Sequence, residues 1–211
     1  MIRNLYIVGA GGFGRELAFW LKQHPDYGMT WSLKGFLDDN AKALDGIDFP
    51  YAVVGRIEDF QPAENDLFIC AIGVPKIKKE IIPKLQKRGA KFLSFIHPSV
   101  IMGEKVALGE GVVLCPGVIL TSCLQVGDFA MMNCLSSAGH DVTIGDYSTI
   151  SGHCDLTSYT TLEEAVFLGS GATLLPKVRV GQGATVGAGA VVVQRVKPGQ
   201  TVFGNPARVI A

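Results

Sequence analysis

Long apolar runs are missing from this 211-residue sequence. A membrane-spanning helix needs about 18 consecutive apolar residues, whereas the longest apolar stretches here, such as Val112–Leu120, are interrupted by Cys, Pro and Gly. The first residues form a strand-like segment that leads into a glycine-rich turn, unlike a secretory signal. We therefore expect a cytoplasmic protein without membrane insertion, whose 48% hydrophobic residues are buried within the fold or between subunits.

Charge is also scarce, because only 18% of the residues are charged and the 19 basic and 19 acidic residues cancel. No basic cluster suggests binding to nucleic acid. The five cysteines form no C-x-x-C pair and no zinc-finger spacing, so no metal site is predicted. Their odd number fits a reducing compartment, and we expect each to be a small buried apolar residue.

The first half of the chain alternates strand-like and helix-like segments. This alternation is typical of a parallel sheet covered by helices, and it predicts a Rossmann-like α/β domain over residues 1–97. The expected strands are Leu5–Val8, Leu33–Leu37, Ala52–Val54, Asp66–Ile72 and Phe92–Ile96, and the expected helices are Gly12–Lys22 and Lys76–Lys87.

The second half follows a repeat of six residues. Every sixth position from Met102 to Val192 is apolar, and the position four residues after each is small or aliphatic. Such a hexapeptide repeat is typical of a β-helix in which each hexad forms one side of a triangular prism. Residues 98–211 are therefore predicted to form a left-handed parallel β-helix. Residues eighteen apart are expected to stack, and the recurring glycines are expected to permit tight turns.

Several short motifs, taken in order, resemble one family. They are Gly9-Ala-Gly-Gly-Phe-Gly14-Arg-Glu16, Phe36-Leu-Asp-Asp39, Cys70-Ala-Ile-Gly73, Phe95-Ile-His-Pro98, Gly139-His-Asp141 and Phe203-Gly-Asn-Pro-Ala207. With the hexapeptide repeat they resemble the bacterial sugar acetyltransferases that include sialic-acid O-acetyltransferases and N-acetyltransferases of UDP-4-amino sugars. The resemblance implies a homotrimer with acetyl-CoA bound between neighbouring β-helices.

The glycine-rich turn lies between a predicted strand and a predicted helix. It contains Gly9, Gly11, Gly12 and Gly14, three of which form a G-x-G-x-x-G pattern. Backbone N–H groups at a helix N-terminus can bind phosphate. The pattern alone fits NAD, a nucleotide sugar or a turn that binds nothing, but the second mononucleotide half of a dinucleotide fold is missing.

Asp38 and Asp39 end the next strand, where carboxylates can hold hydroxyls or a base edge. The resemblance implies that this edge, with Gly73, binds the sugar acceptor. One position departs from the family, because Phe13 stands where many relatives have a histidine.

His140 is the predicted general base. Acetyl transfer from a thioester requires removal of a proton from the attacking amine or hydroxyl, and imidazole suits this near neutral pH. In the resembling family an acidic residue follows this histidine, as Asp141 does, and Asn133 matches a position beside the substrate. Ser158 lies eighteen residues after His140, so its N–H is the expected donor to the oxyanion. The alternative is a surface histidine at a solenoid corner.

The other histidines carry weaker expectations. Some relatives have a second histidine nine positions after the base, where this chain has Thr149; His153 is displaced and is expected to be solvated. A metal site like that of β-helix carbonic anhydrases needs three histidines, which are not found here. His24 is expected to be solvated and His97 to be structural.

The resemblance places the CoA groove along the later coils, where small residues let pantetheine approach the backbone. Small residues can also simply satisfy the sterics of the corners. The predicted contacts are Gly169, Gly171, Gly187, Ala188, Asn205 and Pro206.

The leading interpretation is an acetyl-CoA-dependent N-acetyltransferase for a nucleotide-linked amino sugar. The runner-up is an O-acetyltransferase for sialic acid or a related sugar, which would use the same base and donor. A trimeric nucleotide-sugar-binding scaffold without catalysis is the alternative of another class.

Overall fold

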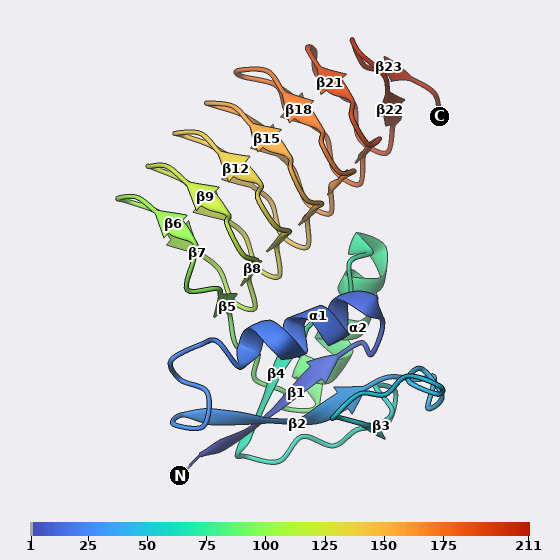
Figure 1. The fold of residues 1–211 in the computed structure, drawn as a ribbon. Helices are drawn as coiled ribbons and strands as arrows, with labels where there is room; N and C mark the ends of the chain where they lie inside the picture. The colour runs from blue at the N-terminus through green and yellow to red at the C-terminus, as the bar shows by residue number, and fades with distance from the viewer. Residues whose placement is uncertain (1) are drawn as a thin grey trace. The chain divides into compact units, whose positions relative to one another are not determined.

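The computed structural model describes residues 2–211 and divides into two compact units (Figure 1). One unit comprises residues 2–73 and 77–95, and the other comprises Val74–Lys76 and Ile96–Ala211. The division falls inside β5 (Phe95–Ile96), close to the boundary at residue 97 that the sequence suggests.

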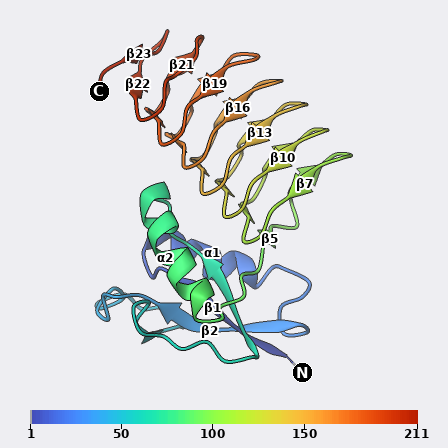
Figure 2. The same ribbon diagram turned by 180° about the vertical axis from the view of Figure 1, so that it is seen from behind.

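The N-terminal unit is a four-stranded parallel sheet in the order β3-β2-β1-β4, with two helices. Its elements are β1 (Arg3–Val8), α1 (Gly12–Leu21), β2 (Trp31–Leu37), β3 (Val53–Gly55), β4 (Asp66–Cys70) and α2 (Pro75–Lys87). Figures 1 and 2 show α1 on one face of the sheet and α2 on the other. Leu17 of α1 and Ile82 of α2 are fully buried with the central strands. Among residues 2–211, neither helix is long and apolar enough to cross a bilayer.

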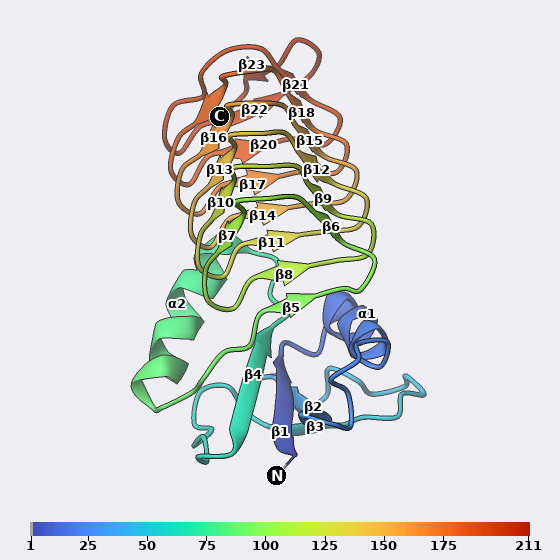
Figure 3. The ribbon, with the colours of Figure 1, turned by 90° about the vertical axis from the view of Figure 1, so that its left-hand side faces the viewer.

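The C-terminal unit is a left-handed parallel β-helix with three faces, each a sheet of two- or three-residue strands (Figure 3). The first face contains β7 (Ala107–Leu108), β10 (Gln125–Val126), β13 (Thr143–Ile144), β16 (Thr161–Leu162) and β19 (Arg179–Val180). The second contains β5, β8 (Val113–Leu114), β11 (Met131–Met132), β14 (Thr149–Ile150), β17 (Phe167–Leu168), β20 (Thr185–Val186), β22 (Thr201–Phe203) and β23 (Arg208–Val209). The third contains β6 (Ile101–Met102), β9 (Ile119–Leu120), β12 (Ser137–Ala138), β15 (Asp155–Leu156), β18 (Thr173–Leu174) and β21 (Val191–Val192).

The register of the β-helix confirms the hexapeptide prediction. Met131 pairs with Thr149 and Ser137 with Asp155, so residues eighteen apart stack on neighbouring coils. The second residue of each strand from β8 to β21 points inward, and Leu114, Met132 and Ile150 are fully buried. One continuous apolar core therefore runs through the prism.

The recurring glycines space the coils, which corrects the expectation that they serve tight turns. They stand at 103, 109, 127, 139, 145, 169, 181 and 187, and none of them has the positive φ of a left-handed turn residue. A Cβ on Gly127 would lie 2.6 Å from the backbone nitrogen of Asp146 on the next coil, closer than real Cβ atoms approach. The left-handed positions are held mostly by other residues, including Asp141 (φ 59°) and Tyr159 (φ 62°).

Among the described residues, none of the five cysteines forms a disulfide, but they do not share one environment. Cys70, Cys115 and Cys154 are buried, as expected. Cys134 is half-buried and Cys123 is exposed, because they are the second and third residues of their turns and so point outward, and the expectation that all five are buried is wrong.

Candidate active site

His140 lies in the turn 139–142, between β12 and β13. Its Nδ1 is 2.8 Å from Oδ2 of Asp141, and the two side chains are 50% and 43% exposed. An ionised carboxylate can only accept a hydrogen bond, so Nδ1 carries the ring hydrogen and donates a hydrogen bond to Asp141. The lone pair on Nε2 is then available to take a proton from a substrate.

One coil further on, the turn 157–160 between β15 and β16 stacks on the turn of His140. The N–H of Tyr159 donates to the carbonyl of His140 at 3.1 Å. Within residues 2–211 the N–H of Ser158 makes no hydrogen bond. A Cβ on Gly139 would lie 2.9 Å from the Ser158 nitrogen, so a glycine there keeps this donor uncrowded. We call these two turns the histidine corner.

Tyr159 is a neighbour of His140 that the sequence analysis missed. The two ring centroids are 5.1 Å apart and the rings are nearly perpendicular, at 87°. The repeat spacing places Tyr159 at this corner, because it lies eighteen residues after Asp141, but the spacing does not show that the ring contacts His140.

Asn133 does not join His140 within one chain. It lies in the turn 133–136 between β11 and β12, at the opposite end of β12 from His140. His153 lies on the same corner as Asn133, one coil further on, in the turn 151–154. The structure thus separates His153 from His140, and we call this second site the asparagine corner.

The predicted CoA contacts Gly169, Gly171, Gly187 and Ala188 belong to later turns of the asparagine corner. A Cβ on Gly169 would lie 2.6 Å from the nitrogen of Ala188, and one on Gly187 would lie 2.3 Å from the Phe203 ring. Coil stacking therefore requires these two glycines irrespective of a ligand. The remaining pair, Asn205 and Pro206, is exposed between β22 and β23.

The glycine-rich turn joins β1 to α1 at the carboxyl end of the sheet. Gly9 has φ 103°, and a Cβ on Gly14 would lie 2.1 Å from the carbonyl oxygen of Gly9, so both positions require glycine. Gly11 is the N-cap of α1, so no side chain caps the first turn of the helix. A Cβ at Gly11 would meet nothing within 4 Å. The first turn of α1 thus starts at an open position, with Gly12 exposed beside Gly11.

Asp38 and Asp39 both bond to the backbone around this edge. Asp38 accepts from the N–H of Ala10 at 2.8 Å and so ties the glycine-rich turn to the end of β2. Asp39 accepts from the N–H of Glu58 at 2.9 Å. Both carboxylates thus hold the local backbone by hydrogen bonds, a structural role that the sequence did not predict.

A hollow of about 350 Å³ lies beside Asp39, between the loop at Ile57–Glu58 and α2. Arg88, just after α2, donates to the carbonyl of Ile57 at 2.7 Å and forms one wall. The glycines of the turn do not line this hollow, and neither does Gly73, which is half-buried after β4. The expected acceptor residues thus share the carboxyl edge of one sheet, but not one pocket.

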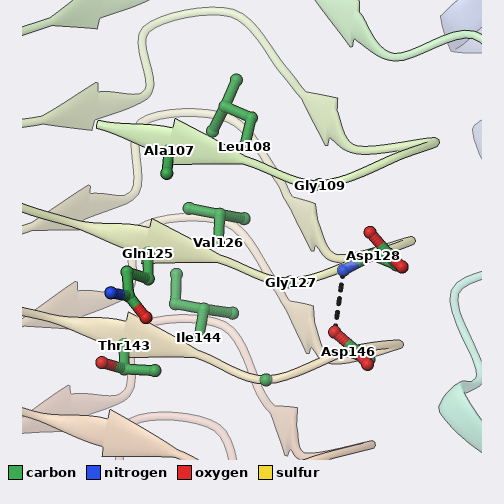
Figure 4. A pocket seen from close by; sticks show the side chains of 11 residues that line it. Ala107, Leu108, Gly109, Gln125, Val126, Gly127, Asp128, Thr143, Ile144 and Asp146 are labelled. Atoms are coloured by element: carbon green, nitrogen blue, oxygen red, sulfur yellow. Dashed lines mark hydrogen bonds between the residues drawn. The ribbon is translucent and has the colours of Figure 1, made fainter. Parts of the chain in front are cut away.

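A second hollow, of about 380 Å³, lies on the outer surface of the first β-helix face (Figure 4). Figure 4 shows β7, β10 and β13 with Asp128 and Asp146 at one end, where the N–H of Asp128 donates to Asp146. We call the turns 109–112, 127–130 and 145–148 the carboxylate corner. None of the site residues predicted from the sequence lines this hollow.

No group of three or more His, Cys, Asp or Glu residues that could hold a metal ion occurs in the part of the chain that the structure describes. The groups that the histidine corner offers for acid–base chemistry are His140 and Asp141, with the N–H of Ser158 as a hydrogen-bond donor.

Comparison with known proteins identifies the family. The family model described as the PglD N-terminal domain matches residues 4–85, and the hexapeptide repeat of succinyl-transferase matches residues 159–194. The chain is 32% identical over 217 residues to GDP-perosamine N-acetyltransferase of Escherichia coli O157:H7, covering 97% of this chain and 96% of the relative.

Solved structures agree over the whole chain. WeeI from Acinetobacter baumannii AYE has a TM-score of 0.85 at 30% identity, covering 98% of this chain and 99% of that one. PerB from Caulobacter crescentus, solved with CoA and GDP-perosamine, has a TM-score of 0.86 at 26% identity, covering 100% and 99%.

The chain belongs to the family of bacterial sugar acetyltransferases with a left-handed β-helix. It is an enzyme that transfers acetyl groups, which excludes the scaffold without catalysis.

Proposed function

We propose that this enzyme transfers the acetyl group of acetyl-CoA to the amino group of a nucleotide-linked sugar, with His140 as general base. The observation that carries the proposal is the histidine corner, where a carboxylate-bound imidazole lies beside a free backbone N–H. The whole-length similarity to a GDP-perosamine N-acetyltransferase supports an amino-sugar acceptor. The donor is acetyl-CoA, as the CoA in the PerB structure supports.

The chemistry follows from these groups. The neutral amine attacks the thioester carbonyl, and Nε2 of His140 takes a proton from the nitrogen as the C–N bond forms. Asp141 holds the ring through Nδ1 and stabilises the imidazolium. The N–H of Ser158 donates to the oxyanion of the tetrahedral intermediate. Collapse of the intermediate breaks the C–S bond, and the imidazolium returns the proton to the leaving CoA thiolate.

The acceptor is proposed to bind through the N-terminal domain, residues 1–97, and acetyl-CoA through the β-helix, residues 98–211. The open first turn of α1 at Gly11 and Gly12 can receive a diphosphate. Asp38 and Asp39, with Gly73, are the proposed contacts of the nucleoside and sugar. Cysteines without disulfides in the described residues are consistent with a reducing compartment and so support the proposed cytoplasmic location.

A panel of acceptors tests the reaction. Release of free thiol from acetyl-CoA would be measured with a nucleotide-linked 4-amino sugar, with the same nucleotide sugar carrying a hydroxyl in place of the amine, and with sialic acid. We expect turnover with the amine only, and an N-acetyl product by mass spectrometry. Turnover with the hydroxyl compounds alone would replace the proposal by sugar O-acetylation.

We also propose a homotrimer whose active site combines corners of two copies. Asn133 and the predicted CoA contacts lie on the asparagine corner, and His140 lies at the far end of β12, so the same chain does not unite them. A neighbouring copy could supply the asparagine corner.

Mixing two inactive variants tests this shared site. His140→Ala and Asn133→Ala would be unfolded, mixed and refolded together. If the site uses His140 from one copy and Asn133 from the next, random mixing restores about a quarter of the sites. A mixture no more active than its two components would refute the shared site, and sedimentation as a monomer would refute the trimer.

A further inference from the structure

The Asp141 hydrogen bond alone does not hold the His140 ring firmly. Both side chains are about half exposed, and exposed ion pairs contribute little because water competes for both partners. A histidine side chain also has two rotatable bonds, whereas the hydrogen bond restrains only Nδ1. A base that must present Nε2 to a substrate needs a further contact.

Two threonine hydroxyls fix the turn that carries Tyr159. The hydroxyl of Thr160 donates to the carbonyl of Thr157 at 2.6 Å, and the hydroxyl of Thr157 donates to the carbonyl of Leu174 at 2.6 Å. Thr160 is fully buried at a core position where the coils before and after have Val142 and Val178. A polar residue thus interrupts an aliphatic column and stiffens the turn beside His140.

Tyr159 itself has no evident role in the fold. Its side chain is 51% exposed, so it does not fill the core. Its φ of 62° lies in the left-handed region, which is unfavourable for a bulky residue and favours glycine or asparagine. The repeat places other bulky residues, such as Phe129 and Tyr147, at the same φ, so Tyr159 is distinguished by its contact with His140 and not by its backbone.

We propose that Tyr159 is a positioning residue, whose ring packs against the imidazole and holds His140 in the orientation that presents Nε2. The proposal rests on the proposed role of His140 as base. An edge-to-face contact between aromatic rings shifts the balance between side-chain orientations by about 2- to 10-fold.

Two substitutions separate the ring from the hydroxyl. Tyr159→Leu keeps a γ-branched residue at the same φ but removes the ring, and kcat should fall about 2- to 10-fold while the KM for acetyl-CoA is unchanged. Tyr159→Phe keeps the ring and should retain the wild-type kcat. Tyr147→Leu is the matched control, since Tyr147 has φ 57° in a turn of the carboxylate corner; its kcat should not change.

A third variant separates activity from stability. Tyr159→Asn places a residue that tolerates the left-handed region, so the melting temperature should stay the same or rise. The kcat should nevertheless fall as in Tyr159→Leu. A residue with only a structural role would give the opposite pattern, with activity preserved in the Asn variant.

NMR of histidine-labelled protein observes the contact without an assay. The Cε1–H resonance of His140, assigned by its loss in His140→Ala, should lose the ring-current shift of Tyr159 in the Leu and Asn variants and keep it in the Phe variant. Wild-type kcat in Tyr159→Leu, or an equal loss in Tyr159→Phe, would overturn the positioning role. Full activity in His140→Ala would instead overturn the proposed base, and the NMR result would still report whether the rings are packed.

Discussion

The histidine corner and the carboxylate corner are built from the same repeat, but they differ in whether their backbone N–H groups are hydrogen-bonded. At the carboxylate corner, Glu110 N–H donates to Asp128 at 2.8 Å and Asp128 N–H donates to Asp146 at 2.9 Å, each reaching to the next coil. At the histidine corner, the equivalent N–H groups of His140 and Ser158 have no acceptor among the described residues.

The difference fits the roles proposed for the two corners. At the carboxylate corner, the carboxylate of the next coil satisfies the N–H groups of Glu110 and Asp128. At the histidine corner, which we propose faces the substrate, the N–H of Ser158 has no acceptor among the described residues, and Asp141 binds the imidazole of His140. Changes at the two corners should therefore separate turnover from stability.

The largest expected effect is that of His140→Ala. Loss of a general base should lower kcat by about 10²–10⁴-fold and leave acetyl-CoA affinity nearly unchanged, because the ring acts mainly in the transition state. Asp141→Asn should reduce kcat less, since Asp141 only orients and polarises the ring. Steady-state kinetics at saturating acceptor would measure both. His153→Ala is the control, and a greater loss there than in His140→Ala would show that the base is misassigned.

A Cβ added at each corner gives the second largest effect. In Gly139→Ala the new Cβ would lie 2.9 Å from the Ser158 nitrogen and must displace it. Disturbing an oxyanion donor should lower kcat by about 10- to 100-fold. In Gly127→Ala the Cβ would lie 2.6 Å from the Asp146 nitrogen, so this variant should lose stability at least as much but keep its turnover per folded molecule. Equal losses of kcat in both would mean that Gly139 only spaces the coils.

The sequence predicts the stacking of this corner because its register is regular. A repeat without insertions from Met102 to Val192 fixes which residues lie eighteen apart, and this spacing alone is enough to place Ser158 beside His140. The same arithmetic places Tyr159, but a half-exposed aromatic ring in a turn gives no sequence signal that it touches the base.

Whether each backbone N–H group of a turn is hydrogen-bonded could not be predicted from the sequence. Asp128 and Asp141 both lie in turns of the same repeat that begin with glycine, yet one accepts from a turn N–H group and the other from an imidazole. Which of these occurs depends on the side-chain orientation and on what the neighbouring coil offers. The role of the glycines was misread for a related reason, since coil spacing is a contact between distant residues and not a local backbone preference.

A smaller effect is expected from Asp146→Ala at the carboxylate corner. The N–H of Asp128 would lose its acceptor, and the free energy of unfolding should fall by about 1 kcal/mol. The kcat should not change, because this corner contributes no proposed catalytic group. Urea unfolding and the thiol-release assay would measure the two quantities. A large loss of kcat in properly folded Asp146→Ala would remove the distinction between the corners.

The smallest effect concerns Glu163. It lies in the turn 163–166, on the same edge of the prism as the carboxylate corner and two coils from Asp128. The hydrogen bond from Arg179, at 2.6 Å, and that from the N–H of Gln182 lower the pKa of Glu163 below its ordinary value of 4.5. A carboxyl with a lowered pKa in the folded state adds stability above its ordinary pKa, and that stability is lost as the pH falls through the lowered value. Glu163→Gln should therefore melt slightly below the wild type, by about 1–2 °C near pH 7. The gap should narrow as the pH falls below about 4.5, because the wild-type carboxyl becomes neutral like the amide. Thermal melts across this range test the idea, and a gap independent of pH would mean that the interaction with Arg179 does not stabilise the turn.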